Sequence, residues 1–308
     1  MKAWLQLIRV PNLLTVPGDP IAGFLVISLL TGAKADTLLI VAVISSLLLY
    51  IGGLITNDVC DMEIDREQRP TRPLPSGRIS PAAASSTATV LFITALLISF
   101  FYGSHDLFVL SAVLCLLTLT YNRLTKSIPV LGVTNMALCR AFNVLLGTAA
   151  GGFGINDAQT FVSDPIVMSA VLFAPSVIFV YTLALSIVAK NETHGKIDIL
   201  AFAPAFVIAL VGLSRVCELY RNLTTITAFL SALCLTAGLT VTIRSGWKIY
   251  HAEYPAMTPK HVGHLISGMI PLQTFLMLTA GEAGILPAAL TIAAYPIFFA
   301  LARKFYAS

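Results

Sequence analysis

A short stretch near residue 60 carries acidic side chains at helical spacing. Asn57, Asp58, Asp61 and Asp65 occupy positions i, i+1, i+4 and i+8. Because residues three or four apart share one face of a helix, the three aspartates form an acidic stripe if the stretch is helical. Carboxylate and amide oxygens are hard ligands that suit Mg²⁺, which commonly bridges one or two carboxylates to a substrate phosphate. The spacing therefore predicts a Mg²⁺ site.

Arginines follow these acids directly, at Arg66, Arg69 and Arg72. A guanidinium group matches the oxygens of a phosphate with two parallel hydrogen bonds. Acids that hold a metal ion, followed by arginines that hold phosphate, predict a site for metal–diphosphate chemistry. The alternative is an ordinary charged loop at a membrane surface, but such loops carry their positive charge without a spaced acidic stripe.

The elements that must position this site are membrane helices. The chain has 308 residues, of which 57% are apolar and 11% are charged, whereas a soluble domain carries about 25% charged residues. Apolar runs long enough to cross a bilayer recur from end to end, and strand-like alternation is absent. We predict an all-α, polytopic membrane bundle that forms one domain over residues 1–308. The ten expected spans lie near residues 13–31, 37–56, 81–102, 106–121, 130–151, 165–188, 198–217, 224–243, 262–280 and 284–302.

The distribution of lysine and arginine predicts the orientation of these spans. With the N-terminus inside, fifteen basic residues fall on the inner side and three on the outer side. This asymmetry follows the positive-inside rule, so we expect the N-terminus and the charged clusters on the cytoplasmic side. Topology and attraction to anionic lipid then explain the net charge of +4, and nucleic-acid binding is not expected.

Polar residues inside or beside the spans extend the predicted site. Arg140 and Asn143 lie one turn apart in the fifth expected span. A charged residue near the bilayer centre costs about 2.5–3.5 kcal/mol and normally faces the bundle interior. We expect Arg140 to face a cavity and to hold diphosphate or orient an acceptor; the alternative is a structural hydrogen bond to a neighbouring helix. At the inner end of the fourth span, Tyr121 and Lys126 are further candidates, although positive-inside bias alone also accounts for Lys126.

Several of these motifs resemble one known family. Residues 57–66, NDVCDMEIDR, fit the NDxxDxxxDR signature of the UbiA family of intramembrane prenyltransferases. The resemblance covers roughly residues 5–200 and is strongest at this motif. Also similar to the family are RVPN at 9–12, RPLPSGRIS at 72–80 and YNRLTK at 121–126, and residues 132–147 look like the fifth helix of its EboC-like bacterial branch.

The resemblance implies a helical bundle, usually of nine spans, around a cavity open to the cytoplasm and to lipid. It implies that Mg²⁺ on two Asp-rich motifs binds a prenyl diphosphate, whose allylic cation alkylates a small acceptor, often an aromatic ring. By this resemblance Asp58, Asp61 and Asp65 are the catalytic residues, and with Asn57 they hold the first metal ion. The residues expected to contact diphosphate or to line its pocket are Asn12, Arg66, Arg72, Tyr121, Lys126, Arg140, Asn143 and Lys190.

The second Asp-rich motif of the family is degenerate in this sequence. The matching place, residues 190–198, reads KNETHGKID, where Glu192 is the only acid at the expected position. In one interpretation, Asn191 and Glu192 hold a second metal ion. In another, one metal ion suffices and Lys190 and Lys196 contact the diphosphate directly. In a third, the protein binds a prenyl lipid or transports it without transferring it. Transporters place ionisable groups near the membrane midplane, whereas most acids here lie at the inner surface, which favours an enzyme.

Overall fold

The computed structural model describes residues 2–154, 163–193, 199–222, 224–251 and 258–305, and every regular element in these ranges is a helix. This confirms the predicted all-α fold. The helices are α1 (Lys2–Leu7), α2 (Val10–Leu13), α3 (Gly18–Thr31), α4 (Thr37–Cys60), α5 (Met62–Gln68), α6 (Pro81–Tyr102), α7 (His105–Thr120), η1 (Tyr121–Thr125), α8 (Pro129–Ala150), α10 (Pro165–Thr193), η3 (Ile199–Phe202), α11 (Ala203–Asn222), α12 (Thr225–Tyr250), α13 (Thr258–Ser267), α14 (Met269–Leu278), η4 (Gly281–Gly284) and α15 (Ile285–Phe305).

Within the described ranges, eight helical segments are long and apolar enough to cross a membrane. They coincide with eight of the ten predicted spans. The expected span at 198–217 falls on η3 and α11, where the apolar helical segment runs only over Ile199–Ser214. The expected span at 262–280 falls on α13 and α14, which are separate helices on either side of Gly268. The count of ten crossings therefore stays a prediction.

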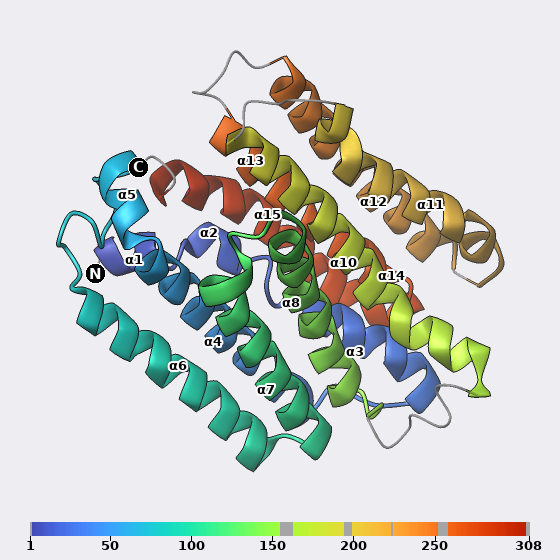
Figure 1. The fold of residues 1–308 in the computed structure, drawn as a ribbon. Helices are drawn as coiled ribbons and strands as arrows, with labels where there is room; N and C mark the ends of the chain where they lie inside the picture. Colours follow the sequence, from blue (N-terminus) through green and yellow to red (C-terminus); the bar gives the residue numbers. More distant parts are fainter. Residues whose placement is uncertain (1, 155–162, 194–198, 223, 252–257, 306–308) are drawn as a thin grey trace.

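The helices form an elongated bundle (Figure 1). Its edges are α6 on one side and the pair α11 and α12 on the other, with α3, α8 and α14 between them. The first helix α1, the short helix α5 and the C-terminal end of α15 lie at the same end of the bundle, as an even number of crossings requires. This end carries the predicted site.

Helices α3 and α8 pack at very close range through small residues. A Cβ atom at Gly147 would overlap the backbone carbonyl oxygen of Pro20, and one at Gly23 would overlap that of Val144. Close packing at small residues is a principal source of helix association in a bilayer, because lipid supplies little hydrophobic driving force. The same contact brings the polar residues of α8 against the start of α3.

Three serines join α4, α6 and α7. The Ser45 and Ser99 hydroxyls lie 2.9 Å apart, and the Ser99 and Ser111 hydroxyls are also 2.9 Å apart. All three side chains are buried, and hydrogen bonds of this kind hold membrane helices together. They fix one face of α4 against α6 and α7, and the neighbouring face of α4 is turned toward the site.

Candidate active site

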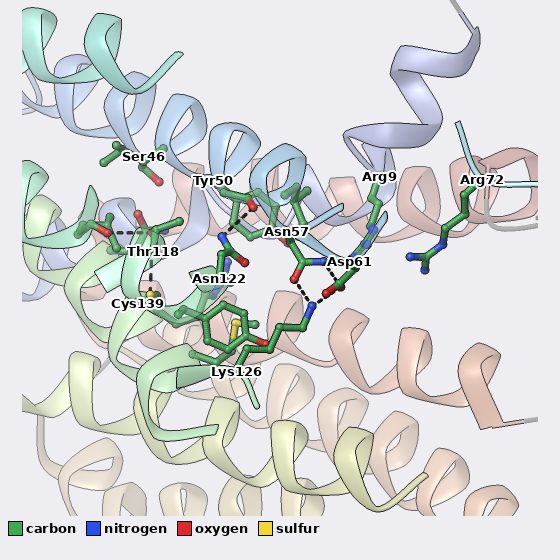
Figure 2. Close-up of a pocket in the computed structure, with 18 of the residues that line it drawn as sticks. Arg9, Ser46, Tyr50, Asn57, Asp61, Arg72, Thr118, Asn122, Lys126 and Cys139 are labelled. Carbon is green, nitrogen blue, oxygen red and sulfur yellow. Dashed lines mark hydrogen bonds and ion pairs between the residues drawn. The ribbon is translucent and has the colours of Figure 1, made fainter. Parts of the chain in front are cut away.

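A cavity of about 380 Å³ opens among α4, α7, η1 and α8. One face of α4 and the residue after it supply much of the lining, through Ser46, Tyr50, Gly53, Asn57 and Asp61, which follow at intervals of three or four residues. Figure 2 labels Ser46, Tyr50, Asn57 and Asp61 of this series, with Ser46 and Asp61 on opposite sides of Tyr50. The charged residues of the lining are Arg9, Asp61, Arg69, Arg72, Lys126 and Arg140.

The predicted acidic stretch is nearly one continuous helix. Helix α4 ends at Cys60 and α5 begins at Met62, but backbone hydrogen bonds cross the junction. The Asp61 amide donates to the Asn57 carbonyl at 3.0 Å, and the Asp65 amide donates to the Asp61 carbonyl at 2.8 Å. Asp61 therefore keeps a helical relation to the residues on either side, as the spacing predicted.

A π-helical turn at the end of α7 sets the position of Lys126. The Lys126 amide donates to the Tyr121 carbonyl, five residues back, at 3.0 Å. Such single π turns insert one extra residue and occur often at functional sites. Asn122 in this turn donates to the Gly53 carbonyl of α4 at 3.1 Å, which ties the turn to the cavity wall.

Each of the three motif aspartates is paired with a basic side chain from another segment. The basic partners come from the link between α1 and α2, from the chain after α5, and from the end of η1. The pairs are Arg9 Nη2 with Asp58 Oδ1 at 2.6 Å, Arg72 Nη1 with Asp65 Oδ2 at 2.6 Å, and Lys126 Nζ with Asp61 Oδ2. The acids therefore fix the positions of three cations, and each uses one carboxylate oxygen to do so.

Asn57 lies between two of these pairs. Its Nδ2 atom is 3.3 Å from Oδ1 of Asp58 and 3.2 Å from Oδ2 of Asp61, while its Oδ1 accepts from Lys126 at 2.7 Å. Asn57, Asp61 and Lys126 point toward one another in Figure 2. Asp58 and Asp61 thus share a contact with the Asn57 amide group.

The charged end of the cavity has an excess of positive charge. Four cationic side chains line it there, those of Arg9, Arg69, Arg72 and Lys126, against one acid, Asp61. The other two motif acids are buried behind them, at 5% exposure for Asp58 and 4% for Asp65. Such a rim concentrates anions and offers several charge-assisted donors to a phosphate group.

Arg9 has a left-handed backbone conformation, with φ of 48°. An arginine in this region is strained by about 1–3 kcal/mol and persists only where its surroundings hold it. Here the ion pair with Asp58 holds the side chain at the cavity. The resemblance singled out the segment around Arg9, but Arg9 itself was not predicted as a site residue, whereas Arg69 was expected as one of three arginines that hold phosphate.

Arg140 and Asn143 line the cavity and also join a buried network with Asp19. Asp19 is fully buried, and its Oδ2 atom lies 3.0 Å from Arg140 Nε in an ion pair that lacks the alignment of a hydrogen bond. The same Oδ2 atom accepts a hydrogen bond from Asn143 Nδ2 at 3.1 Å. Gln273 of α14 donates to Asp19 Oδ1 at 2.6 Å, and Arg140 donates to the Thr15 carbonyl at 3.0 Å. Both predicted roles of Arg140, as a cavity residue and as a link between helices, therefore have a structural basis.

Sequence reasoning missed two members of this network, Asp19 and Gln273. Asp19 lies inside the first predicted apolar span, and an acid within a membrane span should itself indicate a buried partner. Gln273 lies more than 250 positions away in sequence and forms no motif with it.

Three other predicted residues lie outside the cavity lining. Asn12 is buried at 5% exposure and is hydrogen-bonded to the Tyr50 hydroxyl, one layer behind the wall. The Arg66 side chain is 53% exposed and pairs with Glu63 at 2.8 Å. Lys190 is half-buried near the end of α10.

The degenerate second motif can be placed only by its backbone. Helix α10 continues through residues 191–193, and its C-terminal end lies at the same end of the bundle as α5 (Figure 1). The side chains of Asn191 and Glu192 lie outside the described set, as do residues 194–198, which include Lys196. The interpretations of this motif therefore remain predictions.

The donor set at the first motif fits the predicted Mg²⁺. Among the described residues, no three acidic, histidine or cysteine side chains gather into a metal cage. Mg²⁺ seldom uses such a cage, because it keeps several waters and takes one or two carboxylates together with substrate phosphate. Asp58 and Asp61, joined by Asn57, supply carboxylate oxygens of this kind.

Comparison with known families gives a match over residues 20–201 to the UbiA prenyltransferase family. The chain belongs to this family. A relative in sequence is the digeranylgeranylglyceryl phosphate synthase of Sulfolobus acidocaldarius, which is 34% identical over 152 residues, covering 49% of this chain and 54% of that protein. The chain thus spans about half the length of the relatives that it matches in sequence.

Solved structures of UbiA homologues share the fold. A UbiA homologue from Aeropyrum pernix, in its apo form, matches 88% of this chain and 98% of its own, with a TM-score of 0.62 and 13% identity. A UbiA homologue from Archaeoglobus fulgidus, bound to DMAPP and Mg²⁺, matches 96% of this chain and 99% of its own, with a TM-score of 0.51 and 16% identity. These likenesses confirm the UbiA-type bundle.

Proposed function

We propose that the chain is an integral-membrane, Mg²⁺-dependent prenyltransferase that moves an isoprenoid group from a prenyl diphosphate to a small acceptor. The observation that carries this proposal is the set of three ion pairs at the cavity, Arg9–Asp58, Arg72–Asp65 and Lys126–Asp61. They hold three cations at one end of the cavity, as the leaving diphosphate requires. Membership of the UbiA family and the DMAPP and Mg²⁺ bound to the Archaeoglobus fulgidus homologue support it.

The basic residues act on the leaving group. As the allylic C–O bond breaks, both bonding electrons leave with the diphosphate, and donors already aimed at it stabilise the developing charge. Arg9, Arg72 and Lys126 can turn from their aspartates toward the phosphate oxygens without leaving the cavity rim. An electron pair of the acceptor then forms the new bond, and the acceptor loses a proton to the released diphosphate.

The aspartates hold these cations in place before the substrate arrives. Bound Mg²⁺ would supply further charge neutralisation as a Lewis acid, held by Asp58 and Asp61 with Asn57 in support. The allylic cation needs protection from water, and the cavity offers apolar walls at Leu49, Leu114 and Met136 for this purpose.

We place this site and the N-terminus on the cytoplasmic side because of the positive-inside asymmetry. Two acceptor classes fit the proposal. The family resemblance suggests an aromatic ring, and the name of the Sulfolobus acidocaldarius relative suggests a glyceryl phosphate compound. The rival function is a lipid-binding protein or a transporter that uses the same bundle.

Diphosphate release from purified protein tests the proposal. Full-length protein in detergent is incubated with DMAPP, geranyl and geranylgeranyl diphosphate, with Mg²⁺ or with EDTA, and with or without candidate acceptors. We expect Mg²⁺-dependent release that Asp61→Asn abolishes while the protein keeps its thermal unfolding temperature. Glu63→Gln is the matched control, since Glu63 is an exposed acid of the same stretch that pairs only with Arg66 among the described contacts. Unchanged release in Asp61→Asn, or binding of all donors without any release, would reject the transferase.

A further inference from the structure

The π-helical turn η1 decides which way the Lys126 side chain points. Lys126 Nζ pairs with Asp61 and donates to Asn57 Oδ1 at 2.7 Å, so it faces α4 at the first motif (Figure 2). A π turn holds one residue more than an α turn, and one residue of an α-helix corresponds to a rotation of about 100°. If η1 relaxed to a regular α-helix, the Lys126 side chain would therefore turn away from α4 by about this angle.

Contacts with the neighbouring helices favour η1 over a regular helix. Helical turns of the π type are uncommon and need such support. On one side, Asn122 donates to the Gly53 carbonyl of α4 at 3.1 Å. On the other side α8 approaches closely, since a Cβ atom at Gly132 would lie 3.0 Å from the Thr125 carbonyl oxygen and 3.1 Å from that of Lys126. The turn is thus held between α4 and α8.

Asn135 of α8 binds this turn with both ends of its amide. The residue is 7% exposed. Its Oδ1 atom accepts from the Tyr121 backbone amide at 3.2 Å and from the Thr125 hydroxyl at 3.0 Å, and its Nδ2 atom donates to the Leu117 carbonyl at 3.2 Å. The reverse orientation would bring its N–H groups against the N–H group of Tyr121. One side chain thus contacts the last turn of α7 and both the first and the last residue of η1.

Asn135 reaches the site only through this turn. Its neighbours Met136 and Cys139 on α8 line the cavity, whereas Asn135 lies outside the lining. Burying an amide is unfavourable unless its hydrogen bonds are made, so an apolar side chain would fill the same space at lower cost. The bonds that compensate this amide go to η1 and to the turn before it, which makes the shape of η1 the property that Asn135 controls.

We infer that Asn135 is a positioning residue that keeps η1 in its π form and thereby holds Lys126 at the diphosphate end of the cavity. The role rests on the proposed function, because that function gives Lys126 its contact with phosphate. Asn135 itself touches neither donor nor acceptor, and it sets the direction of the Lys126 cation before a substrate binds.

Coupling between Asn135 and Lys126 in ligand binding tests this role. The ligand is an unreactive thio analogue of geranyl diphosphate, titrated calorimetrically with Mg²⁺ into full-length Asn135→Leu, Lys126→Met and the double variant. We expect Asn135→Leu to weaken binding about fivefold to tenfold, and Lys126→Met about 10- to 100-fold, because a misdirected or missing cation loses a charge-assisted hydrogen bond. The double variant should bind no more weakly than Lys126→Met alone, since Asn135 acts through Lys126.

Two further variants separate this role from a general loss of stability. Ser111→Ala is the matched control, because its buried hydroxyl on α7 pairs with Ser99 at 2.9 Å, ten residues before η1. It should lower the unfolding temperature and leave the affinity for the analogue unchanged. Thr125→Val removes one donor to Asn135 and keeps the shape of the side chain, so it should weaken binding in the same direction as Asn135→Leu. It replaces Asn135→Leu in the cycle if that variant does not fold.

The role of Asn135 is overturned by independent, multiplying losses in the double variant, or by full affinity in both Asn135→Leu and Thr125→Val. It is also overturned if Lys126→Met keeps full affinity, or if Ser111→Ala weakens binding as much as Asn135→Leu does. Diphosphate release from geranyl diphosphate by the unaltered protein separates the two proposals. Coupled binding without any release rejects only the transferase, and release without coupling rejects only the positioning role.

Discussion

The buried ion pair between Asp19 and Arg140 should be the most sensitive polar contact in the bundle. Asp19 is fully buried and Arg140 is 7% exposed. The Asp19 carboxylate accepts hydrogen bonds from Gln273 at 2.6 Å, from Asn143 at 3.1 Å and from Arg140 Nη2 at 3.4 Å. Its Oδ2 atom also lies 3.0 Å from Arg140 Nε. Asp19→Asn keeps the shape of the side chain but removes its charge, and it turns an NH₂ group toward donors. Arg140 then becomes a buried charge without a counterion.

The expected cost follows from this geometry. Removing one partner of a buried ion pair destabilises a protein by about 3–5 kcal/mol, because the remaining charge stays desolvated. For a chain of this size the loss lowers the unfolding temperature by roughly 10 °C. The assay is thermal unfolding in detergent of Asp19→Asn, Arg140→Gln and the double variant. Since the double variant buries no charge, it should recover about 2 kcal/mol or more relative to the sum of the single variants.

A surface pair provides the control for this cycle. The Arg66 side chain is 53% exposed and pairs with Glu63, and exposed pairs contribute about 0–1 kcal/mol. Arg66→Gln should therefore change the unfolding temperature little. A cost below about 1 kcal/mol for Asp19→Asn, or simple additivity in the double variant, would show that water or a rearranged partner compensates Arg140, and the argument from burial would fail.

Two further predictions concern the cation at η1 and the contact between α3 and α8. Lys126→Met should raise the KM for a prenyl diphosphate about 10- to 100-fold in a steady-state release assay, because a hydrogen bond to a charged group contributes about 1.5–3 kcal/mol. The control is Arg123→Met, because Arg123 is exposed on the same turn. Equal KM values for the two variants would contradict a phosphate role for Lys126. Gly147→Ala should destabilise the protein by about 1–3 kcal/mol in thermal unfolding, since its Cβ would overlap the Pro20 carbonyl. Gly263→Ala, in a helix with open space around the new atom, should be neutral or slightly stabilising, and similar losses at both glycines would contradict the close-packing argument.

Apolar length predicted the bundle well because it is a local property. Eight of the ten expected spans match apolar helices of membrane length in the described ranges. The other two stay predictions, and they fall where local composition changes within the segment. The end of α11 carries Arg215, Glu218 and Arg221, and α13 and α14 separate at Gly268. Hydropathy averages over such changes and cannot say whether a segment crosses, kinks or divides.

The site was predictable where its residues share one helix. Spacing alone placed Asp61 with Asn57, and the structure keeps that relation. Spacing could not show that Asp58 pairs with Arg9, because that contact joins residues 49 positions apart through a strained backbone conformation. The network around Asp19 joins α3, α8 and α14, and its geometry depends on the close packing at Gly147. Contacts of this kind are set by tertiary structure and leave no local pattern.

The three ion pairs also bear on the degenerate second motif. If the acids of the two motifs served only as metal ligands, the loss of acids from residues 190–198 would remove one of the two metal ions. Half of the metal charge that neutralises diphosphate would then be missing. In the structure the acids of the first motif fix Arg9, Arg72 and Lys126, so under the proposed function these side chains would supply part of that neutralisation. Fewer metal ions are then needed to stabilise the leaving group, because charge-assisted donors act on the same oxygens. This arrangement favours the interpretation in which one metal ion suffices, with the required cations supplied by the cavity rim rather than by Lys190.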